Sequence, residues 1–225
     1  MQFFEMKKVI LSLALVAFGW GAAQAQQYQG VVKTNPLGYF AGQFMFGYEH
    51  MLSDRMSVQL MPGLVNQSSS QSWTIGTETY SYEQKKSGFI VVPEFRYYVA
   101  PDRTGAPHGL YVAALARVLS LTYALEDTGS LFPYGDLSRV DKRTVLGGGA
   151  VLGYQLASSK GFTAEVFAGP QFKSVTFERT YDSPAIGTTE AGDALFEEKF
   201  LDFSLSGVDN SGAGLRFGIN VGYAF

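Results

Sequence analysis

The last fifteen residues of the chain alternate between large apolar and small side chains. Counting back in twos from Phe225, every position is apolar: Tyr223, Val221, Ile219, Phe217, Leu215 and Ala213. The positions between them are mostly glycine. A period of two predicts a β-strand, and a soluble β-sandwich would carry bulky polar side chains opposite its apolar face. Glycine on that face instead predicts a narrow closed barrel, in which inward side chains converge.

The same alternation recurs along the chain and predicts further strands at 43–49, 56–64, 89–99, 110–123, 144–156 and 162–172. A weaker first strand covers about residues 28–34, just before Asn35 and Pro36. The segment 110–123 is apolar on both faces, so Arg117 has to orient it. An arginine that faces lipid near the bilayer midplane costs about 2–4 kcal/mol, and we therefore expect the odd positions of this segment inside the barrel.

Short and long connections alternate between these strands. Residues 52–55 and 157–161 make tight turns, whereas the links 67–87, 127–142 and 181–210 are long and polar. Outer-membrane barrels show this alternation, with short periplasmic turns and long extracellular loops. With residues 35–41 as one more outer turn, we predict an all-β fold, an eight-stranded antiparallel transmembrane β-barrel. Trp73, Ile75, Tyr80 and Tyr82 suggest that the first long link begins as a continuation of its strands above the membrane.

The composition excludes several other classes of protein. The chain is 15% aromatic, has 26 glycines and is only 16% charged, which is too apolar for an ordinary soluble surface. The absence of cysteine excludes disulfides, thiolate metal sites and cysteine nucleophiles. The formal net charge is −3, and because no basic stripe is present, nucleic acid is not expected as a partner.

The N-terminal 25 residues have the organisation of a signal peptide. Lys7 and Lys8 precede an apolar stretch over residues 9–19, and Ala23-Gln24-Ala25 provides the small residues that a signal peptidase reads. The stretch is shorter than the ~20 residues that a membrane-spanning helix needs. We therefore predict a signal peptide over residues 1–25, a barrel domain over residues 26–225 and export to the cell outer membrane.

Several short motifs carry a resemblance to known proteins: Val32-Lys33-Thr34-Asn35-Pro36-Leu37, Gly47-Tyr48-Glu49 with the turn Ser53-Asp54-Arg55, and Gly222-Tyr223-Ala224-Phe225 at the end. With them the mature chain resembles the small outer-membrane, porin-like β-barrel proteins of Gram-negative bacteria, in particular those of Bacteroidota. The resemblance implies outer-membrane lipid, periplasmic chaperones and the barrel-insertion machinery as partners. It also implies that Tyr223 and Phe225 form the assembly signal that this machinery reads, although Asn220 stands where the signal usually has glycine.

Charged residues are expected in the lumen, on the face opposite the apolar one. This face carries a lumen charge network of Glu49, Glu94, Arg96, Arg117, Glu165, Lys173 and Arg216. Side chains just fill the interior of an eight-stranded barrel, and an unpaired buried charge is very costly. A salt-bridged plug is therefore the favoured interpretation, and a charged constriction for small solutes is the alternative.

No catalytic, cofactor or metal site is predicted. The chain has two histidines, His50 and His108, and both fall beside or within periplasmic turns. No nucleophile motif, zinc-ligand pair or phosphate-binding loop is present, and the triple glycine 147–149 lies within a strand pattern, where glycine indicates close packing or a bend.

The loops 67–87, 127–142 and 181–210 are the candidates for contact with a cell-surface ligand. Aromatic residues in the first are able to stack on sugars or proteins. The last carries an acidic set, whose spacing matches no metal-binding loop: Glu190, Asp193, Glu197, Glu198, Asp202 and Asp209. We predict a non-enzymatic outer-membrane barrel with a structural or surface-interaction role, and as the alternative a narrow porin-like channel.

Overall fold

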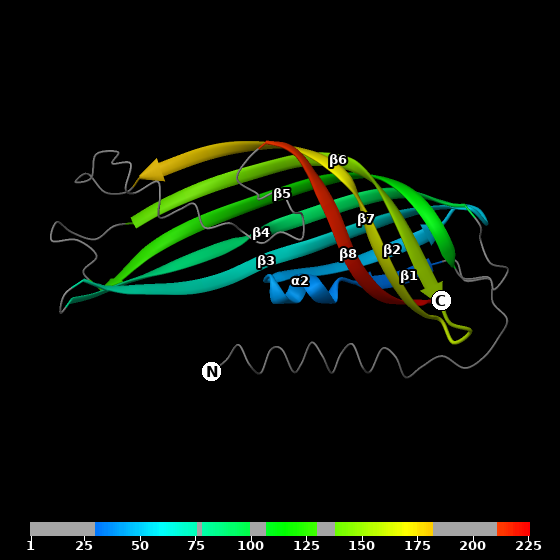
Figure 1. The fold of residues 1–225 in the computed structure, drawn as a ribbon, viewed down its shortest axis with the longest axis horizontal. Coiled ribbons are helices and arrows are strands. Elements are labelled where there is room, and N and C mark those ends of the chain that lie inside the picture. Colours follow the sequence, from blue (N-terminus) through cyan, green and yellow to red (C-terminus); the bar gives the residue numbers. More distant parts are fainter. Residues whose placement is uncertain (1–29, 76–77, 100–106, 130–137, 182–210) are drawn as a thin grey trace.

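The computed structural model describes residues 30–75, 78–99, 107–129, 138–181 and 211–225. Nearly all of them lie in eight strands, which close into one antiparallel barrel (Figure 1). Each strand pairs with its neighbours in sequence, and β1 closes the barrel against β8. The predicted fold class is confirmed. The strands are β1 (Gly30–Thr34), β2 (Gln43–Met51), β3 (Met56–Ile75), β4 (Glu78–Tyr98), β5 (Gly109–Gly129), β6 (Ser138–Ala157), β7 (Phe162–Tyr181) and β8 (Gly212–Ala224).

One helical turn, α2 (Pro36–Phe40), connects β1 to β2. The Asn35 side chain caps it by accepting a hydrogen bond from the Gly38 N–H at 2.9 Å, and proline at the first position fits the missing helical donor there. The Tyr39 ring stacks on Phe44 at 5.4 Å, and Phe40 is 88% exposed. The outer turn predicted over residues 35–41 is thus an ordered helical turn that exposes an aromatic side chain.

The strands alternate between an apolar exterior and a packed interior. Large exposed apolar side chains cover the outside in every strand from β1 to β8, among them Val32, Phe46, Leu60, Phe95, Val112, Leu152, Val166 and Phe217. On β5 the odd positions point inward, and Arg117 is buried. This is the orientation that the cost of a lipid-facing arginine predicts.

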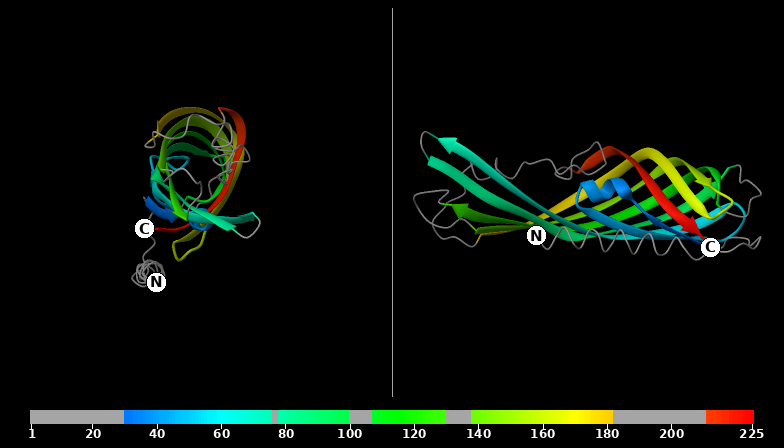
Figure 2. Two further views of the ribbon diagram at one scale, coloured as in Figure 1. Left: turned by 90° about the vertical axis from the view of Figure 1, so that its left-hand side faces the viewer. Right: turned by 90° about the horizontal axis from the view of Figure 1, so that it is seen from below.

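The barrel wall has unequal height around its circumference (Figures 1 and 2). Strands β3 to β7 have 20 or 21 residues, whereas β1, β2 and β8 have 5, 9 and 13. The β2–β3 ladder ends at the pair Gln43 and Val65, and the β7–β8 ladder ends at Lys173 and Gly212. Beyond these pairs the described wall consists of β3 to β7 alone. We call this five-stranded part the extension, and the opposite end, with the short turns and the C-terminus, the turn end.

The extension corrects the predicted boundaries of two loops. Residues 67–75 and 78–87 belong to β3 and β4, and residues 127–129 and 138–142 belong to β5 and β6. The polar composition of these segments suggested loops, but serine, threonine and glutamine are tolerated in a strand wherever it leaves the apolar surroundings. The prediction that the first link begins as a strand continuation is confirmed, because β3 and β4 pair as far as Ile75 and Glu78.

Three prolines lie within strands with their side chains outward: Pro62 in β3, Pro93 in β4 and Pro170 in β7. At each proline the strand stays paired with one of its two neighbouring strands. The ladder with the other neighbouring strand is interrupted there over two residue pairs. Proline has no N–H to donate, which explains the interruption. The interrupted ladders are β2–β3, β4–β5 and β6–β7, so they alternate around the wall.

Candidate functional site

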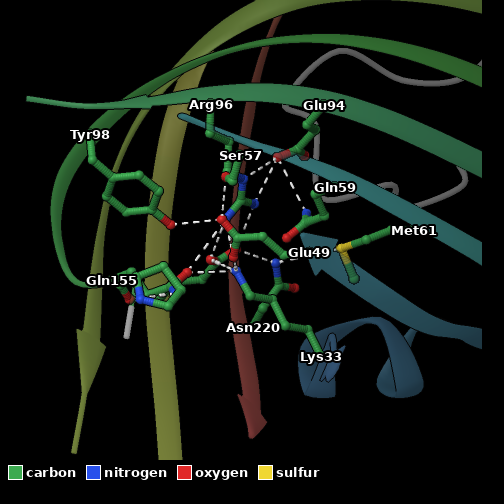
Figure 3. A network of polar contacts seen from close by, with 12 residues as sticks. Lys33, Glu49, Ser57, Gln59, Met61, Glu94, Arg96, Tyr98, Gln155 and Asn220 are labelled. Atoms are coloured by element: carbon green, nitrogen blue, oxygen red, sulfur yellow. Dashed lines mark hydrogen bonds and ion pairs between the residues drawn. The ribbon is translucent and has the colours of Figure 1, made fainter. Parts of the chain in front are cut away.

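A buried polar network fills the barrel near the turn end, and Arg96 of β4 lies at its centre (Figure 3). The Arg96 guanidinium donates to Glu94 from Nε at 3.1 Å and from Nη2 at 2.7 Å. It also donates to the two carboxylate oxygens of Glu165 at 2.7 and 3.1 Å. A planar guanidinium with five donors can contact both oxygens of Glu165 and still donate twice to Glu94, which the three donors of an ammonium group cannot do with the same geometry.

Lys33 of β1 completes the charge pairing from the other side of the lumen. Its Nζ lies 2.5 Å from a Glu49 oxygen and 2.6 Å from a Glu165 oxygen. The same ammonium donates to the Gln155 side-chain oxygen at 2.6 Å. Glu165 therefore links both cations of the network, and the barrel wall is bridged from β1 through β7 to β4.

Neutral donors serve the remaining carboxylate oxygens. Glu49 accepts from the Ser57 hydroxyl at 2.5 Å and from the Tyr98 hydroxyl at 2.8 Å. Glu165 accepts from the Asn220 amide at 2.5 Å. These bonds matter because the network holds three carboxylates against two cations, and a buried carboxylate without full charge compensation needs hydrogen-bond donors.

All eight strands contribute to this network. Tyr111 brings in β5, because the Arg96 guanidinium lies 4.6 Å from its ring centroid, and Gln59 of β3 donates to Glu94 at 3.3 Å. The three carboxylates and both cations are at most 5% exposed. Side chains from every part of the wall thus meet on the barrel axis, and the lumen is occupied at this level.

An apolar layer lies next to the network, on the side of the extension. Its buried side chains are Met45, Met61, Val92, Leu115, Val151 and Phe167. Glycines on neighbouring strands make room for the largest rings: a Cβ at Gly218 would lie 2.5 Å from the Phe167 ring, and one at Gly153 would lie 2.3 Å from the Tyr111 ring. The glycine-rich inner face seen in the sequence is therefore the space that large inward side chains fill.

The predicted lumen residues fall into two groups. Glu49, Glu94, Arg96 and Glu165 come together in the network described above. Arg117 and Lys173 are buried, and Arg216 is half-buried on the inner face, but they lie farther toward the extension. Arg117 is six positions along β5 from Tyr111, and Lys173 is eight positions along β7 from Glu165.

The second cation of the network and all its neutral members were not predicted from the sequence. Lys33 lies in the weakest predicted strand, but the outward apolar residue Val32 beside it was a usable signal for an inward Lys33. The neutral members Ser57, Gln59, Tyr98, Tyr111, Gln155 and Asn220 lie on the same inward positions as the predicted charges.

The inner face of the extension is rich in cations. Lys86 and Arg143 are at most 5% exposed, and both lie over the Tyr123 ring, at 5.8 and 4.5 Å from its centroid. Arg143 also lies 5.0 Å from the centroid of Phe177. Asp141 is buried beside them.

The two histidines lie apart from the network. His50 is exposed on the outside of β2 and stacks on Tyr48 at 6.2 Å, while His108 contacts the Tyr154 ring edge-on at 5.8 Å. Within the described ranges, no group of three or more histidine, cysteine or acidic residues is placed to hold a metal ion. The acidic set of residues 182–210, the signal segment 1–25 and the side chains of Trp73, Tyr80 and Tyr82 lie outside the described residues.

The two residues of the predicted assembly signal lie at the seam between β8 and β1. Tyr223 pairs with Val32 on β1 and with Phe162 on β7. Phe225 donates its N–H to the Gly30 carbonyl at 2.9 Å, and its ring, 58% exposed, stacks on Tyr48 at 6.3 Å. The C-terminal residue is therefore fixed in the wall by its backbone and leaves its ring accessible.

Among the described residues, no helix has the length and apolar character needed to cross a membrane.

Residues 9–195 match the model of a protein family of unknown function, DUF3575. The chain belongs to this family. None of the curated proteins with which the sequence was compared matches it.

Two solved structures are similar to the chain. CarO of Acinetobacter baumannii is 14% identical, with a TM-score of 0.40, and the alignment covers 91% of this chain and 100% of CarO. CarO2 of the same organism is 11% identical, with a TM-score of 0.38 and coverage of 88% and 98%. At this level of similarity the function of the DUF3575 chain has to be argued from its own residues.

Proposed function

We propose that the chain is an integral β-barrel of the bacterial outer membrane that is closed to solutes and acts non-enzymatically at the cell surface through its extension. Membrane insertion is supported by the exterior, where leucine, valine, phenylalanine and tyrosine side chains on all eight strands are 37–67% exposed. A water-soluble monomer rarely exposes a continuous apolar surface of this extent, whereas a transmembrane barrel presents such a band to lipid.

The orientation follows from the connections. The turn end carries the tight turns 52–55 and 158–161 together with the C-terminus, and short turns are periplasmic in outer-membrane barrels. The extension is then extracellular. Strands of 20 residues are about twice as long as the 9–11 residues that a tilted strand needs to cross the bilayer, so about half of each long strand projects beyond it.

The main support for a lumen that is closed to solutes is the network around Arg96. It draws on every strand, and its charged groups are at most 5% exposed. Opening a water path there would separate Arg96 from Glu94 and Glu165, which it contacts at 2.7 Å. The apolar layer beside the network adds a second obstacle, because a hydrated solute would have to lose its water to pass it.

Solute passage is the direct test of this proposal. Purified barrel in liposomes is expected to give no swelling with a graded series of small sugars and amino acids, while a general porin inserted in parallel gives swelling. Planar bilayers with the same preparation are expected to show no steady single-channel currents. Large, steady currents would establish the alternative, a narrow porin-like channel, and would refute the closed state.

The predicted partners follow from the same proposal. Folding is expected to depend on periplasmic chaperones and the barrel-insertion machinery, which would read Tyr223 and Phe225 as the assembly signal. Phe225 is accessible for such reading, being 58% exposed. A relationship to the outer-membrane barrels of Bacteroidota stays a prediction from the sequence.

A further inference from the structure

The edge of β3 in the extension carries backbone groups that no described strand pairs. The last contact with the β2 side is the bond from the Asn66 N–H to the Gly42 carbonyl, at 2.9 Å. From residue 66 to Ile75, β3 pairs with β4, and the described residues provide no strand on its other side. The edge is therefore about ten residues long, the length of an ordinary binding strand.

The alternation of a strand shows which groups point to the open side. Asn66 directs its N–H toward β2, and in a β-strand the N–H and C=O of every second residue point the same way. Ser68, Ser70, Ser72 and Thr74 therefore direct their N–H and C=O groups away from β4. The intervening residues direct theirs toward the β4 ladder.

Within the part of the chain that the structure describes, this edge lacks the features that usually protect an exposed strand. Natural proteins protect free edges with charged side chains, prolines, bulges or very short strands. No residue from Met56 to Thr77 is charged, and no proline or bulge interrupts β3 beyond Pro62. The edge of β7 on the other side of the opening differs, because Glu178 and Arg179 lie in it.

Across the opening from this edge, one inward side chain of β7 is exposed to solvent. Phe177 shares the inner face of β7 with Lys173, yet it is 45% exposed, whereas Lys173, where β8 is still present, is 8% exposed. The difference agrees with the wall formed by the described residues, in which β8, β1 and β2 do not reach the level of Phe177 (Figure 2).

We propose that the open edge of β3, residues 66–75, binds an extended, uncharged polypeptide segment of another surface or secreted protein as an added strand. Addition of a strand to a free sheet edge obtains its affinity from main-chain hydrogen bonds. The absence of charge on residues 56–77 favours an uncharged segment, because the edge strand itself offers no opposite charge for it to pair with. The inference rests on the proposed function, since it places the extension outside the cell.

A second copy in the same membrane does not fit this edge. Barrel strands are tilted by about 35–45° from the barrel axis. In two barrels related by an axis along the membrane normal, the facing β3 edges would cross at about 70–90° and make no continuous ladder. The occupant is therefore a segment free to align with β3.

The test uses the full barrel in lipid nanodiscs and a fluorescent ten-residue peptide with the sequence of residues 66–75, which is uncharged. The peptide is expected to bind the unaltered barrel. Ser70→Pro removes one outward N–H and puts a ring on the edge, and it leaves the β4 ladder intact because Ser70 does not donate to β4. We expect at least a tenfold loss of affinity for Ser70→Pro and no change for the matched control Ser70→Ala.

A peptide that is N-methylated at alternate residues should not bind, because it lacks the main-chain donors. Heat-modifiable migration of Ser70→Pro equal to that of the unaltered barrel shows that the variant is folded. Absence of peptide binding, or equal binding by Ser70→Pro and Ser70→Ala, overturns the proposal. So does dimerisation of the barrel in nanodiscs that Ser70→Pro abolishes, because the occupant is then a second copy. None of these outcomes affects the closed state, which solute passage decides separately.

Discussion

Replacement of Arg96 by alanine is expected to destabilise the barrel strongly. The change removes the four hydrogen bonds to Glu94 and Glu165, at 2.7–3.1 Å, and leaves three carboxylates with Lys33 as the one remaining cation of the network. Removal of one partner from a buried ion pair costs about 3–5 kcal/mol, because the other charge stays buried without compensation. We expect Arg96→Ala to lower the free energy of unfolding by at least that amount.

Urea unfolding of the barrel in lipid vesicles, followed by tryptophan fluorescence and heat-modifiable migration, measures this loss. With a denaturant slope of about 1–3 kcal/mol/M, the midpoint should fall by about 1 M or more. Arg55→Ala is the matched control, because Arg55 is exposed in a turn and its guanidinium donates to the Tyr97 hydroxyl at a long 3.5 Å. A loss for Arg96→Ala within 1 kcal/mol of the control would refute the central role of this arginine.

A compensating variant tests the charge argument itself. Combining Arg96→Met with Glu94→Gln and Glu165→Gln removes one cation and two carboxylates, which leaves Lys33 paired with Glu49 at 2.5 Å. Replacement of a whole buried ion pair by neutral groups is often close to neutral for stability. We expect the triple variant to recover more than half of the stability that Arg96→Ala loses. A triple variant no more stable than Arg96→Ala would mean that packing, and not charge, explains the loss.

Three further substitutions examine the packing, the exterior and the C-terminus. Gly153→Val should cost about 1–3 kcal/mol in urea unfolding, because its Cβ would lie 2.3 Å from the Tyr111 ring; an unchanged midpoint would show that the ring moves freely. Leu152→Arg should cost about 2–4 kcal/mol if this outward side chain faces lipid, and Asp54→Arg in an exposed turn should cost nothing measurable; equal midpoints would contradict the membrane assignment. Phe225→Asp should reduce the amount of heat-modifiable barrel recovered from cell membranes, and a normal yield would contradict the role of the terminal aromatic in assembly.

The period-two pattern was sufficient to predict which side chains face inward. Arg117 shows why: its strand is apolar on both faces, yet the energetic cost of one outward arginine decides the orientation, and Arg117 is 3% exposed in the structure. The eight strands and their antiparallel order followed from the same pattern and from the connections between them.

The grouping of the charges could not be predicted in this way. Glu165 contacts Lys33, 132 residues away in the chain, and their meeting depends on the tilt of the strands and on how β8 is staggered against β1. A single sequence does not contain this stagger, so Arg117 and Lys173 could not be separated from Glu165 in advance. The length of the extension was missed for a different reason, because polar strand residues and polar loop residues have the same composition.

The positions of the three outward prolines affect how the barrel responds to force. Pro62, Pro93 and Pro170 interrupt three alternate ladders, whereas the ladders β3–β4, β5–β6 and β7–β8 stay continuous at the same level. We expect the barrel wall to bend most easily at these three interruptions, where fewer main-chain hydrogen bonds join neighbouring strands. Lateral pressure from the bilayer is then resisted chiefly by the side chains packed inside, so hollowing out the interior should turn a rigid cylinder into a compliant one.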